Sequence, residues 1–176
     1  HPRAGHTFVP INDGLILMIG SSIHTEIYNP AKNVWISGGD LSQRLIQPEA
    51  VALDNGNVVI VGGFGGLSIS KNVEIWNSDK SMWTVVTAME NGRMGHTATA
   101  LPSGQVLVAG GSLTTEVELL NPEESVWLPA GNLTSSREGH TATLLKDGSV
   151  LFVGGAGTDA GSLSTISVNI YLPISQ

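Results

Sequence analysis

Short runs of apolar residues recur along the chain, and each is bounded by polar or glycine-rich segments. The four residues before each glycine pair, or in one case before Gly20-Ser21, are all apolar; these segments are 16–19, 58–61, 106–109 and 150–153. Unbroken apolar runs of this length, rich in β-branched side chains and bounded by turn residues, are typical of strands that are covered on both faces. The pattern therefore predicts four buried strands.

A predicted turn with a glycine at a constant position precedes each apolar run. The turns are Asn12-Asp13-Gly14, Asp54-Asn55-Gly56, Pro102-Ser103-Gly104 and Lys146-Asp147-Gly148. Tight hairpin turns require residues with positive φ, which glycine adopts most readily. Each apolar run is thus expected to be the second strand of a hairpin. Because no segment shows a sustained helical period, the pattern indicates an all-β protein.

The polar landmarks around these strands repeat four times. Gly-His-Thr occurs at 5–7, 95–97 and 139–141, with Pro48 at the histidine position of the second unit. A Glu-x-Tyr/Trp/Leu-Asn segment follows at 26–29, 74–77 and 118–121, with a degenerate copy at 169–172. A tryptophan stands six residues after the asparagine of each of the first three segments, at Trp35, Trp83 and Trp127. Fixed spacing predicts one repeated backbone, a four-stranded antiparallel meander. The predicted units are residues 1–41, 42–89, 90–133 and 134–176.

At these residues the chain resembles the kelch repeat, in the form found in the propeller domain of galactose oxidase-like proteins. The shared pattern is Arg-x-Gly-His-Thr, Asp-Gly, Gly-Gly, Glu-x-Tyr-Asn-Pro and then Trp, and it covers essentially the whole chain. The resemblance implies a kelch-type β-propeller with four blades of four antiparallel strands, the lower limit for propellers. It also implies a binding platform rather than an enzyme.

The fourth unit departs from the pattern. Its next tryptophan would fall at position 178, beyond the 176 residues given, so the last blade is expected to lack its outer strand. The segment 168–171 would then be an open strand edge. Two expectations follow, namely that the chain is part of a larger propeller or that a second copy pairs at this edge.

Variation in length is confined to the loop between the second and third strands of each unit. The distance from the glycine pair to the glutamate position is 6, 12, 8 and 15 residues in the four units. Loops on a rigid scaffold commonly carry binding, although tolerated drift explains the same variation. The candidate binding residues in these loops are Phe64, Leu67, Thr158 and Asp159.

All four arginines lie near the start of a first strand. Arg3, Arg93 and Arg137 stand three residues before the histidine, and Arg44 stands four residues before Pro48. In an antiparallel meander this places them on the same face as the variable loops. They are suited to binding a carboxylate, sulfate or sugar acid. The alternative is that they pair with Glu26, Glu74 and Glu118 and link neighbouring blades.

The candidates for catalysis and metal binding are weak. The copper chemistry of galactose oxidase uses a cysteine crosslinked to tyrosine, and this chain has no cysteine. The repeated histidines His6, His96 and His140 come from separate units, so a structural role is favoured over metal coordination. The tryptophans are expected to pack within blades. No cofactor and no metal are predicted.

The composition limits the classes of partner that the chain is expected to bind. The net charge is −7 and the basic residues are scattered, which argues against nucleic acid, and no apolar run is long enough to cross a membrane. We therefore expect a non-catalytic binding or scaffold module that recognises a protein or a glycan through the face carrying the variable loops and arginines. The alternatives are a self-assembling homo-oligomer that pairs through the open last blade, the propeller of a larger extracellular enzyme, and an enzyme of unfamiliar type. The absence of cysteine leaves the compartment open, with an extracellular location favoured.

Overall fold

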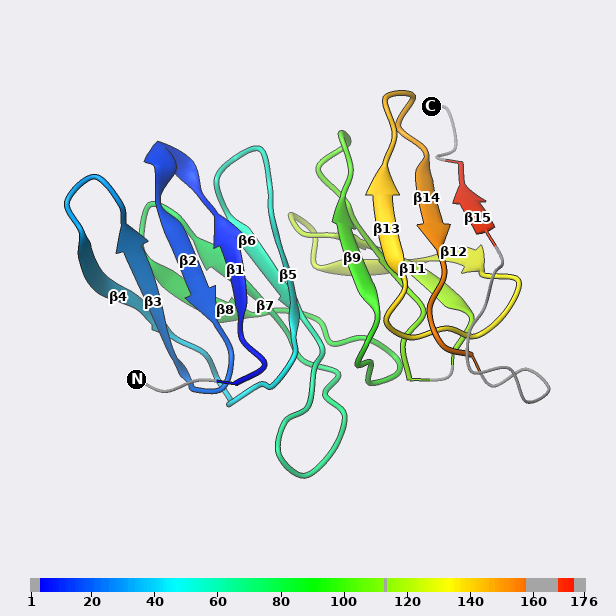
Figure 1. Cartoon of the computed structure of the whole chain (residues 1–176), viewed down its shortest axis with the longest axis horizontal. Coiled ribbons are helices and arrows are strands. Elements are labelled where there is room, and N and C mark those ends of the chain that lie inside the picture. Colours follow the sequence, from blue (N-terminus) through cyan, green and yellow to red (C-terminus); the bar gives the residue numbers. More distant parts are fainter. Residues whose placement is uncertain (1–3, 113, 158–167, 173–176) are drawn as a thin grey trace. The chain divides into compact units, whose positions relative to one another are not determined.

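The computed structural model describes residues 4–112, 114–157 and 168–172, whose regular secondary structure consists almost entirely of β-strands (Figure 1). The strands form four antiparallel sheets, and within each sheet they lie side by side in chain order. Within the described ranges, no helix is long and apolar enough to span a bilayer.

Each sheet corresponds to one predicted blade. Blade one contains β1 (Thr7–Pro10), β2 (Ile16–Ile19), β3 (His24–Asn29) and β4 (Val34–Asp40). Blade two contains β5 (Glu49–Ala52), β6 (Val58–Val61), β7 (Val73–Asn77) and β8 (Met82–Val85). Blade three contains β9 (Thr97–Ala100), β10 (Val106–Ala109), β11 (Glu116–Asn121) and β12 (Val126–Asn132). Blade four contains β13 (Thr141–Leu144), β14 (Val150–Val153) and β15 (Val168–Tyr171).

The four apolar runs form the second strand of each blade, as predicted. Every residue of β6 and β10 is buried, which confirms that these strands are covered on both faces. β14 differs, because Val153 at its end is 42% exposed. The turns before these strands also follow the prediction, with Gly56 and Gly148 both at φ +84°. The first turn adds a short 3-10 segment, η1 (Asn12–Gly14), in which Asp13 also has positive φ.

The chain divides into two compact units, residues 1–94 and 95–176, and each has its own core. The core of the first unit draws on blades one and two and is formed by Val9, Leu17, Ile19, Ile27, Leu41, Leu45, Val58, Ile60, Trp76 and Trp83. The core of the second unit draws on blades three and four and is formed by Leu101, Leu107, Ala109, Val117, Leu133, Val150 and Phe152. Each core therefore joins two neighbouring blades.

Main-chain hydrogen bonds link the two blades within each unit in the same way. In the first unit, Ser21 N–H donates to Leu45 O (2.6 Å) and Gln47 N–H donates to Gly5 O (2.7 Å). In the second unit, Gly111 N–H donates to Arg137 O and Gly139 N–H donates to Gly95 O, both at 2.8 Å. The donors and acceptors occupy equivalent repeat positions, so the same main-chain hydrogen bonds join the two blades in each unit.

The predicted fold class is confirmed. The described residues form an all-β chain of kelch-type propeller blades, three with four antiparallel strands and a last blade with three. The predicted limits of the four units stay a prediction.

Candidate functional site: the loop surface of blade two

The variable loops and the segments that enter the first strands lie together, as expected for an antiparallel meander. Ile46 and Phe64 exchange two backbone hydrogen bonds, at 2.9 and 2.8 Å. Glu138 and Ala156 exchange the same two bonds in blade four, both at 2.8 Å. The residue that follows each of these glycine pairs therefore pairs with the residue two before the histidine position.

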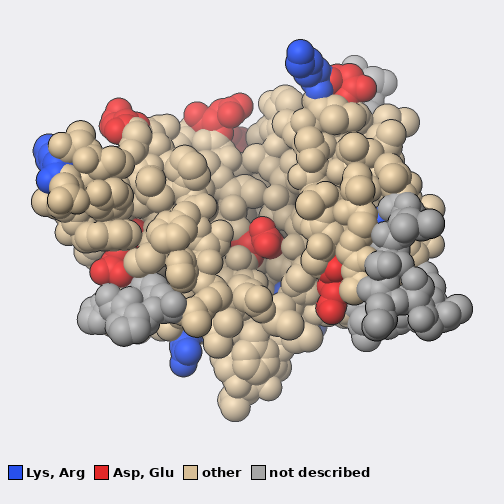
Figure 2. All heavy atoms as spheres, viewed as in Figure 1, with Lys and Arg blue, Asp and Glu red and all other residues tan. Residues whose placement is uncertain are grey.

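The loop between β6 and β7 folds into a small hairpin, which we call the β6–β7 hairpin loop (residues 62–72). Ser70 N–H donates to Gly63 O (2.7 Å) and Gly65 N–H donates to Ser68 O (2.9 Å). Leu67 stands at its tip and is fully exposed. The loop extends well beyond the strands of its unit (Figure 1), and residues 62–70 contain no charged side chain. The corresponding projection at the lower edge of Figure 2 is free of charged atoms.

The base of this loop is held by buried polar contacts. Gln43 Nε2 donates to the buried Ser70 Oγ (2.8 Å), and Arg93 N–H donates to Ser70 O (3.2 Å). A Cβ atom at Gly92 would lie 2.5 Å from Ile69 O, so only glycine permits this approach. The exposed tip therefore rests on a well-fixed base.

Four of the predicted site residues lie at or beneath this surface. Phe64 is half-buried, Leu67 is fully exposed and Arg44 is exposed on the segment that pairs with the loop. Arg93 also lies here, but its side chain is fully buried beneath the surface. Arg3, Thr158 and Asp159 lie outside the described residues.

Arg137 is fully buried in the second unit and is bound within its own blade. Its guanidinium donates to Asn169 Oδ1 (2.9 Å), Gly154 O (3.2 Å) and Ser135 Oγ (3.2 Å). Burial lowers the pKa of Arg137, yet guanidinium groups stay charged in proteins. A guanidinium enclosed in this way contributes to blade structure. A role of the arginines in ligand binding stays a prediction.

The arginine of blade two is not equivalent to the others. Leu45, three residues before Pro48, takes the repeat position of Arg93 and Arg137 and is fully buried, whereas the neighbouring Arg44 is exposed. The offset of Arg44 in the sequence, four residues before Pro48 instead of three, marks this difference.

The buried Glu74 accepts several hydrogen bonds. The sequence had suggested it only as the partner of an arginine. Its carboxylate accepts hydrogen bonds from Ser42 N–H (3.1 Å), Ser42 Oγ (2.8 Å) and Asn72 Nδ2 (2.6 Å). At the same repeat position, Asn169 accepts from Thr134 Oγ1 (3.1 Å) and from Arg137. Glu74 and Asn169 each bind the segment that leads into the first strand of their own blade. In blade two, where Leu45 stands at the arginine position, Asn72 donates a hydrogen bond to Glu74 instead.

The repeated histidines differ in environment. His6 is exposed and meets Phe8 edge-on, whereas His96 and His140 are buried. His140 Nε2 lies 3.0 Å from Thr97 Oγ1, and burial together with the charge of Arg137 lowers the pKa of His140 to about 4. Among residues 4–112, 114–157 and 168–172, no three His, Asp or Glu side chains are grouped so that they could hold a metal ion.

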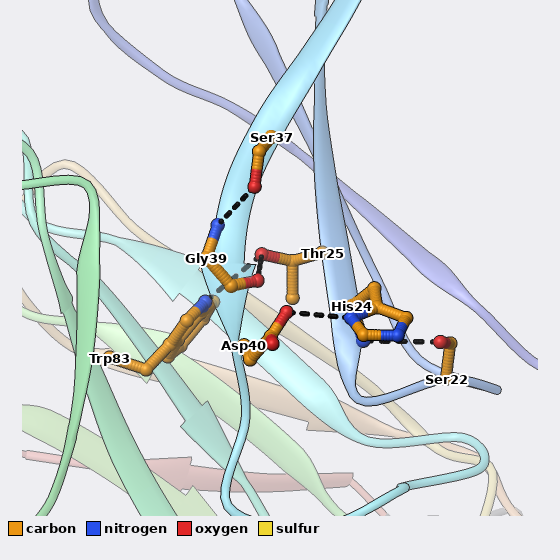
Figure 3. A network of polar contacts seen from close by, with 7 residues as sticks. All are labelled: Ser22, His24, Thr25, Ser37, Gly39, Asp40 and Trp83. Atoms are coloured by element: carbon orange, nitrogen blue, oxygen red, sulfur yellow. Dashed lines mark hydrogen bonds and ion pairs between the residues drawn. The ribbon is translucent and has the colours of Figure 1, made fainter.

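The aromatic residues of blade two pack against blade one. Trp83 Nε1–H donates to Thr25 Oγ1 (3.0 Å), and Thr25 Oγ1 in turn donates to Gly39 O at 2.8 Å (Figure 3). Trp76 Nε1–H donates to Gly38 O (2.9 Å). Trp35 is instead half exposed and contacts Tyr28 in a tilted arrangement, with ring centroids 4.9 Å apart and an interplanar angle of 35°.

Comparison with known proteins supports the kelch-type blades described above. The model of the Kelch motif matches residues 50–90, which cover blade two from its second residue onward. Kelch-like protein 23 from Mus musculus and from Homo sapiens are each 29% identical over 101 residues, and the Pongo abelii protein is 28% identical over 98 residues. These matches cover 54% of this chain and 17% of each relative, so the chain spans a minor part of their length. The motif match, the four repeats and the antiparallel blades together support a kelch-repeat family for the chain.

Proposed function

We propose that this chain is a non-catalytic protein-binding module whose principal contact is the β6–β7 hairpin loop. Kelch repeats and the Kelch-like relatives support protein binding in general. The observation that carries the proposal is the fully exposed Leu67 at the tip of a loop whose base is buried and hydrogen-bonded. Exposed apolar side chains on a fixed loop favour association with an apolar pocket of a partner.

The surroundings of the tip indicate the chemistry of the partner. Ile69 is 39% exposed beside Leu67, and the cationic side chains of Arg44 and Lys71 are exposed near the base of the loop. A protein with an apolar pocket and an acidic rim would complement this surface. A glycan is the weaker match, because small-ligand sites are concave and this loop is convex.

The test begins with a photoreactive leucine analogue in place of Leu67 in the full chain. The protein that becomes crosslinked is identified and purified, and its affinity is measured for the wild type and for Leu67→Glu. We expect Leu67→Glu to weaken binding about tenfold or more, because central apolar anchors carry most of an interface's binding energy.

The matched control is Met82→Glu, an exposed apolar residue on β8, 56% exposed and outside this surface. It should leave the affinity unchanged. Equal affinity of the wild type and Leu67→Glu, with unfolding transitions that coincide, would exclude the hairpin loop as the contact. Binding to a glycan array that survives Leu67→Glu would favour the glycan alternative.

A further inference from the structure

Asparagine followed by glycine occurs twice in the chain, at Asn55-Gly56 and at Asn91-Gly92. Such pairs are prone to deamidation, because the main-chain nitrogen of glycine, with no side chain beside it, can approach the amide carbon of asparagine. Both asparagines are exposed, and each follows an acidic residue, so the two pairs are closely matched. Their surroundings in the fold are not.

The turn before β6 protects Asn55. Gly56 N–H donates to Leu53 O (2.9 Å), so the nitrogen that would attack is already engaged. Asn55 Oδ1 accepts from Asn57 N–H (3.0 Å), which holds the amide side chain within the turn. Both hydrogen bonds oppose the approach of Gly56 N to the amide carbon.

The nitrogen of Gly92 is not engaged in this way. Gly92 lies in the irregular segment between β8 and β9, and among the described residues none accepts a hydrogen bond from its N–H. A Cβ atom at this position would lie 2.5 Å from Ile69 O and 3.2 Å from Ser70 O. The packing of the β6–β7 hairpin loop therefore requires the same glycine that makes Asn91 reactive.

This pair also lies between two main-chain contacts with the base of the hairpin loop. Met89 N–H donates to Lys71 O (3.1 Å) before it, and Arg93 N–H donates to Ser70 O (3.2 Å) after it. The length of main chain between Met89 and Arg93 thus determines how the base of the loop is held.

We propose that Asn91 is a site of spontaneous deamidation, and that its isoaspartate product loosens the base of the β6–β7 hairpin loop. Gly92 N bonds to the side-chain carbonyl carbon of Asn91, and ammonia leaves with the proton that Gly92 N gives up. Water then opens the resulting succinimide. Opening at the side-chain carbonyl gives aspartate. Opening at the main-chain carbonyl gives isoaspartate, whose main chain is longer by a methylene group.

The added methylene group lies between the two contacts, so both cannot keep their geometry. We expect the bond from Arg93 N–H to Ser70 O, the longer of the two, to break. The reaction is then a slow and irreversible change in the loop that carries Leu67. The inference goes beyond the proposed function, since the modification and its effect on the loop are both measured without a partner.

The test incubates the full chain at mildly alkaline pH and follows both Asn-Gly pairs by mass spectrometry, with fragmentation that separates aspartate from isoaspartate. We expect Asn91 to react at least about tenfold faster than Asn55, whose protecting hydrogen bonds have to open first. In urea, where the fold is lost, the two rates should become similar.

Hydrogen exchange on the incubated chain measures the effect on the loop. Amides of residues 62–72 should exchange about threefold to tenfold faster in the isoaspartate form, as expected for the loss of a hydrogen bond. The matched control is Asn91→Gln, which keeps an amide but has to form a larger ring that closes more slowly. Its loop should keep the original exchange rates through the same incubation, whereas Asn55→Gln should change as the wild type does.

Three results would overturn the proposal. They are equal rates at the two pairs in the folded chain, a difference in rate that persists in urea, and isoaspartate at position 91 that leaves exchange of residues 62–72 unchanged. The second result would assign the difference to the neighbouring residues in the sequence instead of the fold.

Discussion

The imidazole of His140 lies 3.0 Å from the hydroxyl of Thr97, and this contact joins blade four to blade three. Burial and the nearby charge of Arg137 lower the pKa of His140 to about 4. The neutral ring is therefore the form that fits the folded state.

Stability should fall in mild acid for this reason. The pKa of histidine in the unfolded chain is about 6.5, so the stabilising effect of the neutral His140 ring is complete above that pH and is lost as the pH falls toward 4. We expect a loss on the order of 2 kcal/mol from this residue, measured as the free energy of unfolding in urea between pH 7 and 4. His140→Gln should remove that part of the pH dependence. His24→Gln, at an exposed histidine, should not; an equal effect of the two substitutions would contradict the assignment.

The hydrogen bond from Trp83 to Thr25 should contribute measurably to the contact between blades one and two. Trp83→Phe keeps an aromatic ring but removes the N–H donor, and Thr25→Val removes the acceptor. A double-mutant cycle on the free energy of unfolding should give a coupling of about 1 kcal/mol. A coupling within error of zero would show that the indole acts through packing alone.

The buried Arg137 and the exposed Arg44 should respond differently to substitution. Arg137→Met keeps much of the side-chain volume but leaves Asn169 Oδ1 and Gly154 O without this donor, so we expect a loss of about 2–3 kcal/mol in urea unfolding. Arg44→Met, at an exposed side chain, should change stability by no more than about 0.5 kcal/mol. A stable Arg137→Met chain with weaker binding of an anionic ligand would restore the ligand-binding role.

Gln47 occupies a backbone position that favours glycine. Its φ is +52°, and the residues at the same repeat position in the other blades are Gly5, Gly95 and Gly139, with φ from +62° to +68°. Gln47→Gly relieves left-handed strain but adds freedom to the unfolded chain, so we expect a net gain of about 0.5 kcal/mol.

The reverse change provides the control for that prediction. A Cβ atom at Gly139 would meet none of the described atoms within 4 Å, so Gly139→Gln tests the backbone conformation without a clash. It should cost about 1 kcal/mol in thermal or urea unfolding. A stabilised Gly139→Gln chain would show that this position does not require glycine.

The strands and turns were predictable because their causes are local. Apolar runs such as 58–61 indicate buried strands, and the glycine in each turn indicates a backbone with positive φ. The burial of β6 and the positive φ of Gly56 confirm both predictions. The surroundings of Arg137 were not predictable in this way. Its burial depends on Asn169, which is 32 residues away, and charged residues are normally exposed.

The candidate site was predictable only in outline. Loop length indicated Phe64 and Leu67, but the exposure of Leu67 depends on the pairing of Phe64 with Ile46, which lies 18 residues earlier in the sequence.

The main-chain bonds between neighbouring blades have a consequence for how this protein changes over evolutionary time. Ser21, Gly111, Leu45 and Arg137 differ widely as side chains, yet their amides and carbonyls make the same connection. A contact of this kind survives almost any substitution that preserves the backbone path. Blades can therefore drift until a family model detects one repeat, residues 50–90, while the structure retains the architecture of four.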